Sequence, residues 1–360
     1  MSLKNNYVAI MAGGIGSRFW PESRNDYPKQ FLDILGTGKS LIQWTYERFK
    51  NICPKENIYI ITNESYIPVL KQQLPDLMDN NILSEPSRKN TAPCAAYIAH
   101  KLLALNPNAN IIMSPADHLI FDERKFERDI IHSLDFVSKN KVLVTLGIKP
   151  TRPDTGYGYI QYETGKFIEE FYEVRTFTEK PSHELAETFV RSGDFLWNAG
   201  IFVWNVNTIV DELQKYLPEM NDVFSQVNEY NTENEHAAIE NVYSQCTNIS
   251  IDYGIMEKSK KVYVKPSYFG WCDLGTWNSA YDNSEKDYLG NAVMGKNVMV
   301  IDASQCMVKA DDDKLVVLQG LENFIVIDTD DVLLICERNR EQQIKDYVAE
   351  VKRNKGDKYL

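Results

Sequence analysis

The chain has 360 residues, which is long enough for a large α/β domain followed by a smaller one. Hydrophobic residues make up 43% of the sequence and charged residues 25%, as is typical of a soluble globular protein. The net charge of −12 argues against general binding to nucleic acid or to an anionic membrane. Any phosphate group must therefore be bound by a local cluster of cations.

The sequence also favours a cytoplasmic protein. No apolar run approaches the roughly 20 residues of a membrane span, and the first residues, MSLKNN, lack the apolar core of a signal peptide. The six cysteines are scattered with no C-x-x-C pair, which suits thiols in a reducing compartment.

Apolar runs predict strands that alternate with helices through the first half of the chain. The expected strands lie at 7–11, 58–62, 111–115 and 142–148, and the expected helices lie at 40–49, around 69, at 91–103 and at 126–137. This alternation predicts a Rossmann-like α/β fold with a mainly parallel mixed sheet. Ligands of such sheets bind beyond the carboxyl ends of the strands.

The remaining chain changes character twice. Residues 151–282 mix short strands with helices and are rich in aromatic residues. Beyond residue 288, short apolar runs recur about every 8–10 residues with Asp, Asn or Gly between them, and a charged helix follows at 338–352. We therefore expect a catalytic domain at 1–285 and a small β-rich domain, resembling a β-roll or β-helix, at 286–360.

The first expected strand leads into a glycine-rich loop, AGGIGSRFWPESRNDYPKQF, at residues 12–31. It is not a dinucleotide fingerprint, because Phe19 stands where the third glycine is needed. Glycines let the backbone approach a ligand closely, and Arg18 and Lys29 follow them. Together these features are typical of a cradle in which backbone N–H groups and fixed cations bind a triphosphate.

Two aspartates are candidate metal ligands. Asp117 follows the expected strand at 111–115, where an aspartate is either a turn or capping residue or an oxygen ligand for Mg²⁺. Asp273 lies in WCDLGTW between two tryptophans, which is a poor place for a carboxylate unless a metal or a cation pairs with it.

Three further stretches suggest a polar ligand, although each also has an ordinary structural explanation. DTGYGYI at 154–160 has the glycines of a loop that closes over a ligand. EKP at 179–181 is either part of a site or a surface ion pair. In WNAG at 197–200, Asn198 is a candidate to hydrogen-bond a hydroxyl group of a ligand, with Trp197 beside it as a platform. The ordinary explanation is that this tryptophan belongs to the core of a strand.

Taken together and in this order, these stretches resemble the nucleotidyltransferases that make nucleotide-sugars, and most closely the bacterial mannose-1-phosphate guanylyltransferase family. The loop at 12–31 matches the signature of that family. The other matching blocks are EPSRKNTAP, PADH, GIKPTRPDTGYGYI, FTEKP, LWNAGIF, SIDYGIMEKS and FGWCDLGTW. The resemblance covers roughly residues 5–285, and the β-rich tail less firmly. The chain resembles the family's short form, so the isomerase domain of longer members is not expected.

The resemblance implies the reaction and the roles of individual residues. The enzyme would transfer GMP from GTP to α-D-mannose 1-phosphate, giving GDP-mannose and pyrophosphate with Mg²⁺ as cofactor. The FWPES form of the loop is similar to the guanylyl branch, whereas the mannose follows from resemblance alone. The implied residues are Arg18, Lys29 and Asp117 for catalysis; Ala12, Gly13, Gly14, Gly16, Ser17, Glu85, Asn90 and Thr91 for the nucleotide; Tyr157, Gly158, Glu179, Lys180, Asn198 and Asp252 for the sugar phosphate; and Asp117 and Asp273 for the metal.

A homodimer is expected, with the β-rich tail as its interface. Two alternatives remain open from the residues. The first is the same reaction with another sugar 1-phosphate or nucleotide, giving GDP-glucose, dTDP-glucose or UDP-glucose. The second is a regulatory subunit that binds nucleotide-sugar without catalysis. Such a subunit would be expected to lack Arg18, Lys29 or a metal carboxylate, and this chain has all of them.

Overall fold

A nine-stranded mixed sheet forms the centre of the first domain in the computed structural model, which describes residues 3–360. Its strand order is β3-β2-β1-β4-β9-β6-β10-β8-β7. The strands of this sheet are β1 (Asn6–Met11), β2 (Ile58–Asn63), β3 (Ile82–Glu85), β4 (Asn110–Pro115), β6 (Leu143–Ile148), β7 (Tyr159–Ile168), β8 (Phe171–Thr178), β9 (Phe195–Asn205) and β10 (Val262–Ser267). The expected strands are thus confirmed, and β3 is an addition.

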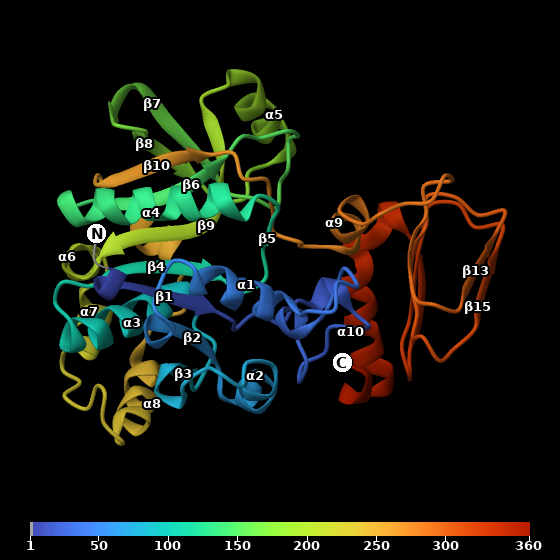
Figure 1. Cartoon of the computed structure of the whole chain (residues 1–360), viewed down its shortest axis with the longest axis horizontal. Helices are drawn as coiled ribbons and strands as arrows, with labels where there is room; N and C mark the ends of the chain where they lie inside the picture. The colour runs from blue at the N-terminus through green and yellow to red at the C-terminus, as the bar shows by residue number, and fades with distance from the viewer. Residues whose placement is uncertain (1–2) are drawn as a thin grey trace.

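Helices cover both faces of this sheet (Figure 1). Alternate residues of β1 show why: Tyr7 and Ala9 pack into one apolar cluster, while Val8 and Ile10 pack into the other. The helices are α1 (Leu41–Lys50), α2 (Ile67–Gln73), α3 (Thr91–Leu105), α4 (Glu123–Lys139), α5 (His183–Ser192), α6 (Val206–Tyr216), α7 (Pro218–Ser225), α8 (Glu235–Gln245) and α9 (Trp277–Asp282). Within residues 3–360, no helix combines the length and apolar character that crossing a bilayer requires.

Strand directions gather several loops at one edge of the sheet. Strands β1, β2, β3 and β4 are mutually parallel, and β6 is parallel to β10. Strand β9 lies antiparallel between β4 and β6, so its first residues reach the edge where those two strands end. The glycine-rich loop, the loops after β4, β6 and β10, and the start of β9 therefore meet at this edge, as the sequence predicted for a ligand site.

The last part of the chain is a small parallel β-solenoid. Strands β12 (Ala292–Met294), β14 (Met307–Lys309) and β16 (Phe324–Asp328) are parallel and form a sheet that antiparallel β17 (Leu333–Glu337) extends. Strands β13 (Val298–Ile301) and β15 (Val316–Gln319) form a second, two-stranded parallel sheet. The short apolar runs expected beyond residue 288 are these strands, and the β-helix-like fold is confirmed.

The final helix, α10 (Ile344–Lys355), returns from the solenoid to the first domain and lies beside its N-terminal segment (Figure 1). Phe19, Trp20 and Trp277 share one apolar cluster with Ile344 and with inward-facing residues of the solenoid. The indole N–H of Trp20 also donates to the carbonyl oxygen of Tyr359, at 2.7 Å. The glycine-rich loop is therefore supported from behind by the C-terminal part of the chain.

Candidate functional site

A cleft of about 310 Å³ opens where strands β1, β3 and β4 end. Its lining residues are Met11, Ala12, Gly13, Gly14, Gln30, Glu85, Arg88, Lys89, Asn90, Thr91, Cys94, Pro115, Ala116 and Asp117. A larger hollow of about 1000 Å³ lies between residues 22–43 and the solenoid, but it is lined by none of the residues to which the sequence assigned a role in catalysis or binding. The smaller cleft is therefore the candidate site.

The start of the glycine-rich loop is held rigidly at the mouth of this cleft. The carbonyl oxygen of Ala12 accepts hydrogen bonds from the Gln30 amide at 2.8 Å and from the Thr62 hydroxyl at 2.9 Å. Further along, Gly16 has φ +64°, and a Cβ atom built there would lie 2.3 Å from the Cβ of Lys29. Only glycine fits here, because the loop folds back on the residue that provides the cation.

Lys29 is buried, with 5% of its surface exposed. Its ammonium group lies 2.9 Å from Oδ2 of Asp117 and donates to the carbonyl oxygen of Asp273 at 2.8 Å. Burial by itself raises the pKa of Asp117, but the charge of Lys29 outweighs it and holds that pKa below its ordinary value. Lys29 thus connects the glycine-rich loop to both expected metal ligands.

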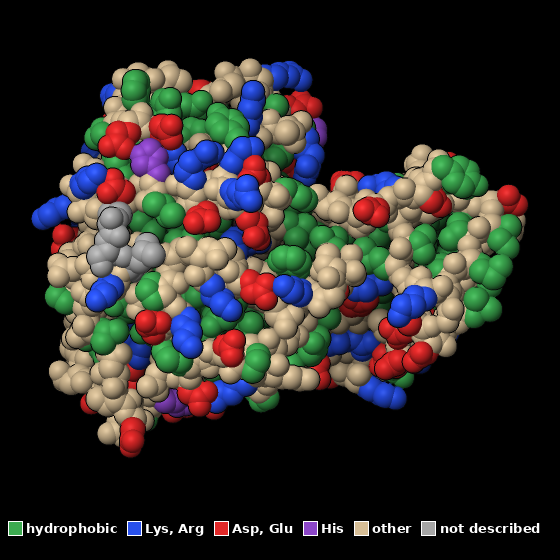
Figure 2. Space-filling view, viewed as in Figure 1, with side chains coloured by type: hydrophobic (Ala, Val, Ile, Leu, Met, Phe, Trp, Pro, Cys, Tyr) green, Lys and Arg blue, Asp and Glu red, His purple; other side chains and the backbone are tan. Residues whose placement is uncertain are grey.

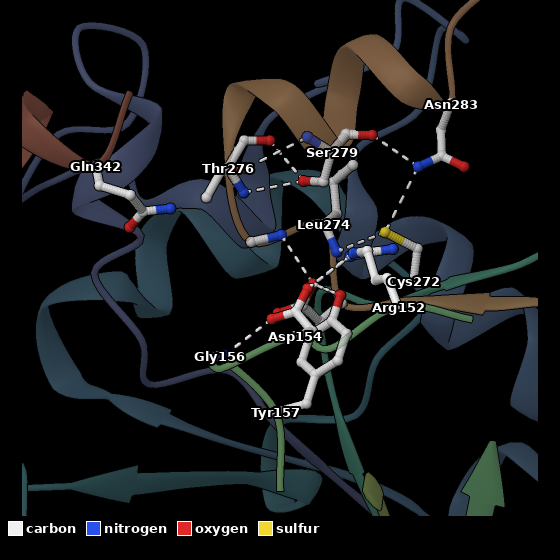
Figure 3. A network of polar contacts seen from close by, with 12 residues as sticks. Arg152, Asp154, Gly156, Tyr157, Cys272, Leu274, Thr276, Ser279, Asn283 and Gln342 are labelled. Atoms are coloured by element: carbon white, nitrogen blue, oxygen red, sulfur yellow. Dashed lines mark hydrogen bonds and ion pairs between the residues drawn. The ribbon is translucent and has the colours of Figure 1, made fainter. Parts of the chain in front are cut away.

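The side chain of Asp273 is oriented by the loop after β6. Its Oδ1 accepts from the hydroxyl of Tyr157 at 2.9 Å and from the backbone N–H of Gly275 at 3.1 Å. The loop that carries Tyr157 is itself stabilised by Asp154, which pairs with Arg152 and accepts from the N–H of Gly156 (Figure 3). A carboxylate placed between two tryptophans in sequence is therefore held by neutral donors.

His118 is unsuited to acid–base catalysis. The indole N–H of Trp271 donates to its Nδ1 at 3.2 Å, which leaves the ring proton on Nε2. Burial lowers the pKa of His118, despite the nearby carboxylates of Asp117 and Asp273. The histidine is a neutral packing residue, consistent with the absence of any role for it among the sequence-based predictions.

The two aspartates fit a magnesium ion. Lys29 contacts the carboxylate of Asp117 and the backbone carbonyl of Asp273. Hydrogen bonds to the Asp273 carboxylate use only Oδ1, so its second oxygen remains available. Within residues 3–360, no three His, Cys, Asp or Glu side chains are grouped to hold a metal by themselves. Two carboxylates suit an ion whose other ligands are substrate phosphates and water, which is how Mg²⁺ is commonly bound.

Glu85, the last residue of β3, lies inside the cleft with 6% of its surface exposed. Its Oε1 accepts from the Cys94 thiol at 2.9 Å and from the Tyr243 hydroxyl at 3.0 Å. Its Oε2 points towards Gly13, where a Cβ atom would lie 3.2 Å away. Burial raises the pKa of Glu85, and the two hydrogen bonds partly oppose that effect. The free oxygen is an acceptor presented to whatever occupies the cleft.

Asn90 and Thr91 begin helix α3 beside Glu85. Asn90 has φ +68°, a conformation that costs energy for a side chain larger than glycine, and its Oδ1 caps the N–H of Thr91 at 3.0 Å. The Thr91 hydroxyl accepts from the N–H of Ile251 at 2.9 Å. This contact fixes the start of α3 to the segment that carries Asp252.

A second group of expected residues lies at the start of β9. The Asn198 amide donates to Oδ1 of Asp252 at 3.0 Å, and the Asn198 backbone N–H donates to the carbonyl oxygen of Gly158 at 2.8 Å. A Cβ atom on Gly158 would lie 2.5 Å from Oε2 of Glu179, which in turn pairs with Lys180. Burial and the neighbouring carboxylate of Glu179 raise the pKa of Asp252 to about 6.

The structure therefore brings the expected residues into two adjacent groups. Tyr157 and Gly158 join them, because the first binds Asp273 and the second contacts Glu179. Arg18 lies apart: it is not among the lining residues of the cleft, and its turn packs against α10. Ser17, in the same turn, is half-buried and also outside the lining.

Sequence reasoning missed several residues of the site. Arg88 and Lys89 line the cleft and belong to the block EPSRKNTAP, in which the sequence predicted only Glu85, Asn90 and Thr91 as site residues. The sequence does not predict Cys94 as a site residue, because a cysteine without a partner motif is usually a packing residue. Gln30 follows Lys29 directly, but only the folded loop shows that its amide holds Ala12.

Comparisons with known proteins agree with this geometry. The model of a family described as nucleotidyl transferase matches residues 7–288, and a model described as MannoseP isomerase/GMP-like beta-helix domain matches residues 296–351. A mannose-1-phosphate guanylyltransferase from Salmonella montevideo is 37% identical over 351 residues, covering 95% of this chain and 73% of that protein. One from Escherichia coli is 35% identical, covering 94% of this chain and 74% of that protein. A crystal structure described as a mannose-1-phosphate geranyltransferase from Thermus thermophilus superposes with a TM-score of 0.85 at 29% identity, covering 97% of this chain and 99% of that one.

Replacing Gly16 with alanine should destabilise the protein, whereas Gly14→Ala should not. At position 16 the backbone is left-handed, and an added Cβ atom would lie 2.3 Å from the Cβ of Lys29. At position 14 an added Cβ atom would have no other atom within 4 Å. Urea unfolding should show a loss of about 1–3 kcal/mol for Gly16→Ala. Equal stability of the two variants would show that the loop does not need the tight approach.

Proposed function

This chain belongs to the nucleotidyl transferase family, and we propose that it transfers GMP from GTP to α-D-mannose 1-phosphate, giving GDP-mannose and pyrophosphate. The observation that supports this most is the position of Lys29. Its buried ammonium group pairs with the Asp117 carboxylate and donates to the backbone carbonyl oxygen of Asp273, beside a cleft lined by the glycine-rich loop. The polar group around Asn198 is joined to Asp273 through the consecutive residues Tyr157 and Gly158. This is an arrangement for joining two phosphate-bearing substrates.

The reaction needs alignment and charge neutralisation more than proton transfer. A phosphate monoester has a second pKa of about 6, so mannose 1-phosphate is mostly a dianion at neutral pH and needs no general base. One of its oxygens forms a bond to the α-phosphorus of GTP. The bond from that phosphorus to the oxygen bridging to the β-phosphorus breaks, and pyrophosphate leaves with the electron pair. Lys29 is placed to oppose the negative charge that gathers at the α-phosphate.

Asp117 and Asp273 would hold Mg²⁺, which when bound neutralises phosphate charge and helps to align the two reacting groups. The chain itself provides the rest of the alignment. The backbone N–H groups from Gly13 to Ser17 are proposed to hold the triphosphate. Tyr157 keeps the Asp273 carboxylate oriented through its hydroxyl.

The cleft suits a guanine base. The Watson–Crick edge of guanine presents two adjacent donors, the N1–H and the N2 amino group, and a carboxylate oxygen accepts from such a pair. Glu85 offers Oε2, while Cys94 and Tyr243 hold its other oxygen in place. Asn90 and Thr91 border the same cleft and complete the proposed nucleotide site.

The second group of residues is proposed to bind the sugar phosphate. Asp252 and Glu179 provide carboxylate acceptors for sugar hydroxyl groups, and Asn198 provides both an amide donor and an acceptor. Because Gly158 has no side chain, Oε2 of Glu179 can lie only 2.5 Å from the position that a Cβ atom of residue 158 would occupy. Lys180 is exposed and close enough to Asp252 to affect its pKa, so it is available for the sugar's phosphate.

We also propose that the protein is a cytoplasmic homodimer whose interface is the solenoid, in a chain divided near residue 285. Large apolar side chains lie exposed on β13, β15 and the residue preceding β15: Met299 (52%), Ile301 (42%), Leu315 (64%) and Val317 (54%). Figure 2 shows green side chains along this end of the molecule. An exposed apolar patch on a soluble unit commonly marks a protein interface, and sedimentation of the full chain measures whether two copies associate.

A pyrophosphate-release assay over a grid of nucleoside triphosphates and sugar 1-phosphates tests the proposed reaction. We expect GTP with mannose 1-phosphate to turn over fastest, and only when Mg²⁺ or a similar ion is added. Faster turnover with glucose 1-phosphate, or with dTTP or UTP, would refute the proposed substrates. It would leave the proposed class of reaction, nucleotidyl transfer to a sugar 1-phosphate, unchanged. Binding of nucleotide-sugar without any turnover would favour the regulatory alternative.

Lys29→Met should lower kcat by about 10²–10³, because it removes a preorganised cation from the α-phosphate. Asp117→Asn and Asp273→Asn should differ from it, since each gives up a charged oxygen ligand and a higher Mg²⁺ concentration should restore part of the activity. Extra Mg²⁺ should not rescue Lys29→Met. Steady-state rates measured across a Mg²⁺ titration separate the two behaviours. These assignments are wrong if added Mg²⁺ does not raise the activity of the two asparagine variants and Lys29→Met is as active as the unaltered protein.

The KM for mannose 1-phosphate should rise as the pH falls below 6. The pKa of Asp252 is raised to about 6, so below that pH its carboxyl takes up a proton and loses an acceptor for a sugar hydroxyl. At pH 5 only about a tenth of the free enzyme would keep the carboxylate, which predicts a rise of about tenfold. The substrate phosphate also titrates near pH 6, so Asp252→Asn provides the control.

In the Asp252→Asn variant, the pH dependence that remains is that of the substrate and of other groups. The ratio of the two KM profiles should therefore change with an apparent pKa near 6. Parallel profiles for the two proteins would contradict a role of the Asp252 carboxylate in binding the sugar.

A further inference from the structure

Arg18 and Lys345 are cations on two elements that pack against each other behind the glycine-rich loop. Arg18 lies in the turn Ser17–Phe19, which packs directly against α10, and Lys345 is the second residue of that helix. The Nε atom of Arg18 is buried without a hydrogen-bond partner. Within residues 3–360, neither cation forms an ion pair with a carboxylate.

The backbone at Lys345 is firmly anchored to the first domain. Its neighbour Ile344 is fully buried in the cluster that contains Phe19 and Trp20. Just before the helix, Glu341 accepts from the N–H of Asn278 at 2.7 Å. The position of the α10 backbone beside the Arg18 turn is therefore a fixed feature of the fold and does not depend on a flexible tail.

This placement is unfavourable without a ligand. Two like charges on packed elements repel each other when no anion lies between them. The charge of Arg18, followed by partial burial, lowers the pKa of Lys345, as expected for two cations on adjoining elements. The acidic residue beside it, Asp346, only partly offsets this repulsion. A bound anion would relieve it.

We propose that Lys345 joins Arg18 in binding the β- and γ-phosphates of the nucleotide and the pyrophosphate that they become. This inference rests on the proposed nucleotidyl transfer. When the bond from the α-phosphorus to the bridging oxygen breaks, the electron pair stays on that oxygen and negative charge on the leaving pyrophosphate increases. Lys29 faces the α-phosphate side, and the Arg18–Lys345 pair supplies cations on the side of the leaving group. The C-terminal helix thus contributes a phosphate-binding residue to a site that the first domain otherwise forms.

The test compares Lys345→Met with Lys355→Met in the full-length chain. Lys355 lies near the other end of α10, is exposed and forms no ion pair among the described residues, so its variant removes the same charge from the same helix. Calorimetry measures binding of inorganic pyrophosphate with Mg²⁺, of GTP and of GMP. Lys345→Met should weaken pyrophosphate and GTP binding by about tenfold, the loss expected for one charge-assisted contact. GMP binding should stay unchanged, and Lys345→Arg should keep most of the affinity.

A structural role for Lys345 would lower the affinity for GMP as well, which overturns the proposal. It is also overturned if pyrophosphate binds Lys345→Met as tightly as Lys355→Met, or if the unaltered protein does not bind pyrophosphate. If Lys345→Met instead changes only the mass of the assembly, the cations face a carboxylate of a second copy and the proposal is likewise overturned. All nucleoside triphosphates share the β- and γ-phosphates, so a different preferred base or sugar would refute the proposed substrates and leave this comparison valid.

Discussion

The buried ammonium group of Lys29 is the contact on which the site depends. A charge removed from water is costly unless it is paired and hydrogen-bonded. Lys29 meets that condition only when Asp117, which follows the first-domain strand β4, and the carbonyl of Asp273, after β10, are both in place. Three segments that are far apart in the chain are thereby held together around one cation. The glycine at position 16 allows the loop to close on it.

Around that cation, most of the polar groups are held by neutral donors. Tyr157 and a backbone N–H fix Asp273, Cys94 and Tyr243 fix Glu85, and Asn198 fixes Asp252. Neutral donors orient a carboxylate without cancelling its charge. In each carboxylate one oxygen is used for positioning and the other stays free for a ligand. The site is preorganised before substrate arrives, which is the form of catalysis that phosphoryl and nucleotidyl transfer chiefly require.

The C-terminal unit supports the glycine-rich loop of the first domain. Its helix α10 packs on the glycine-rich loop, and Trp20 and Ile344 belong to the same apolar cluster. In a chain with a net charge of −12, cations near the phosphates must be positioned individually. The proposed role of Lys345 would explain why a lysine stands in the first turn of that helix. It would also give the solenoid a reason to be fixed to the first domain.

The sequence by itself determined the fold class, the glycine-rich loop and the blocks that carry most of the site. Strands such as β1 and helices such as α4 follow from local periodicity, which depends on neighbours in the chain. The family likewise could be inferred from contiguous motifs, and the comparisons confirm it. Lys29, Asp117 and Asp273 were each candidates because their residue types and neighbours already suggested phosphate or metal chemistry.

Only the tertiary structure decided how these residues meet. Strand β3, the thiol of Cys94 beside Glu85, and the packing of the Arg18 turn against α10 depend on contacts between residues separated by long stretches of chain. Periodicity carries no information about such contacts, because it reports which face of an element is buried and not which element covers it. The approach of Lys345 to the glycine-rich loop is the clearest case. It depends on the solenoid ending where α10 can return to the first domain, and that geometry exists only in the folded chain.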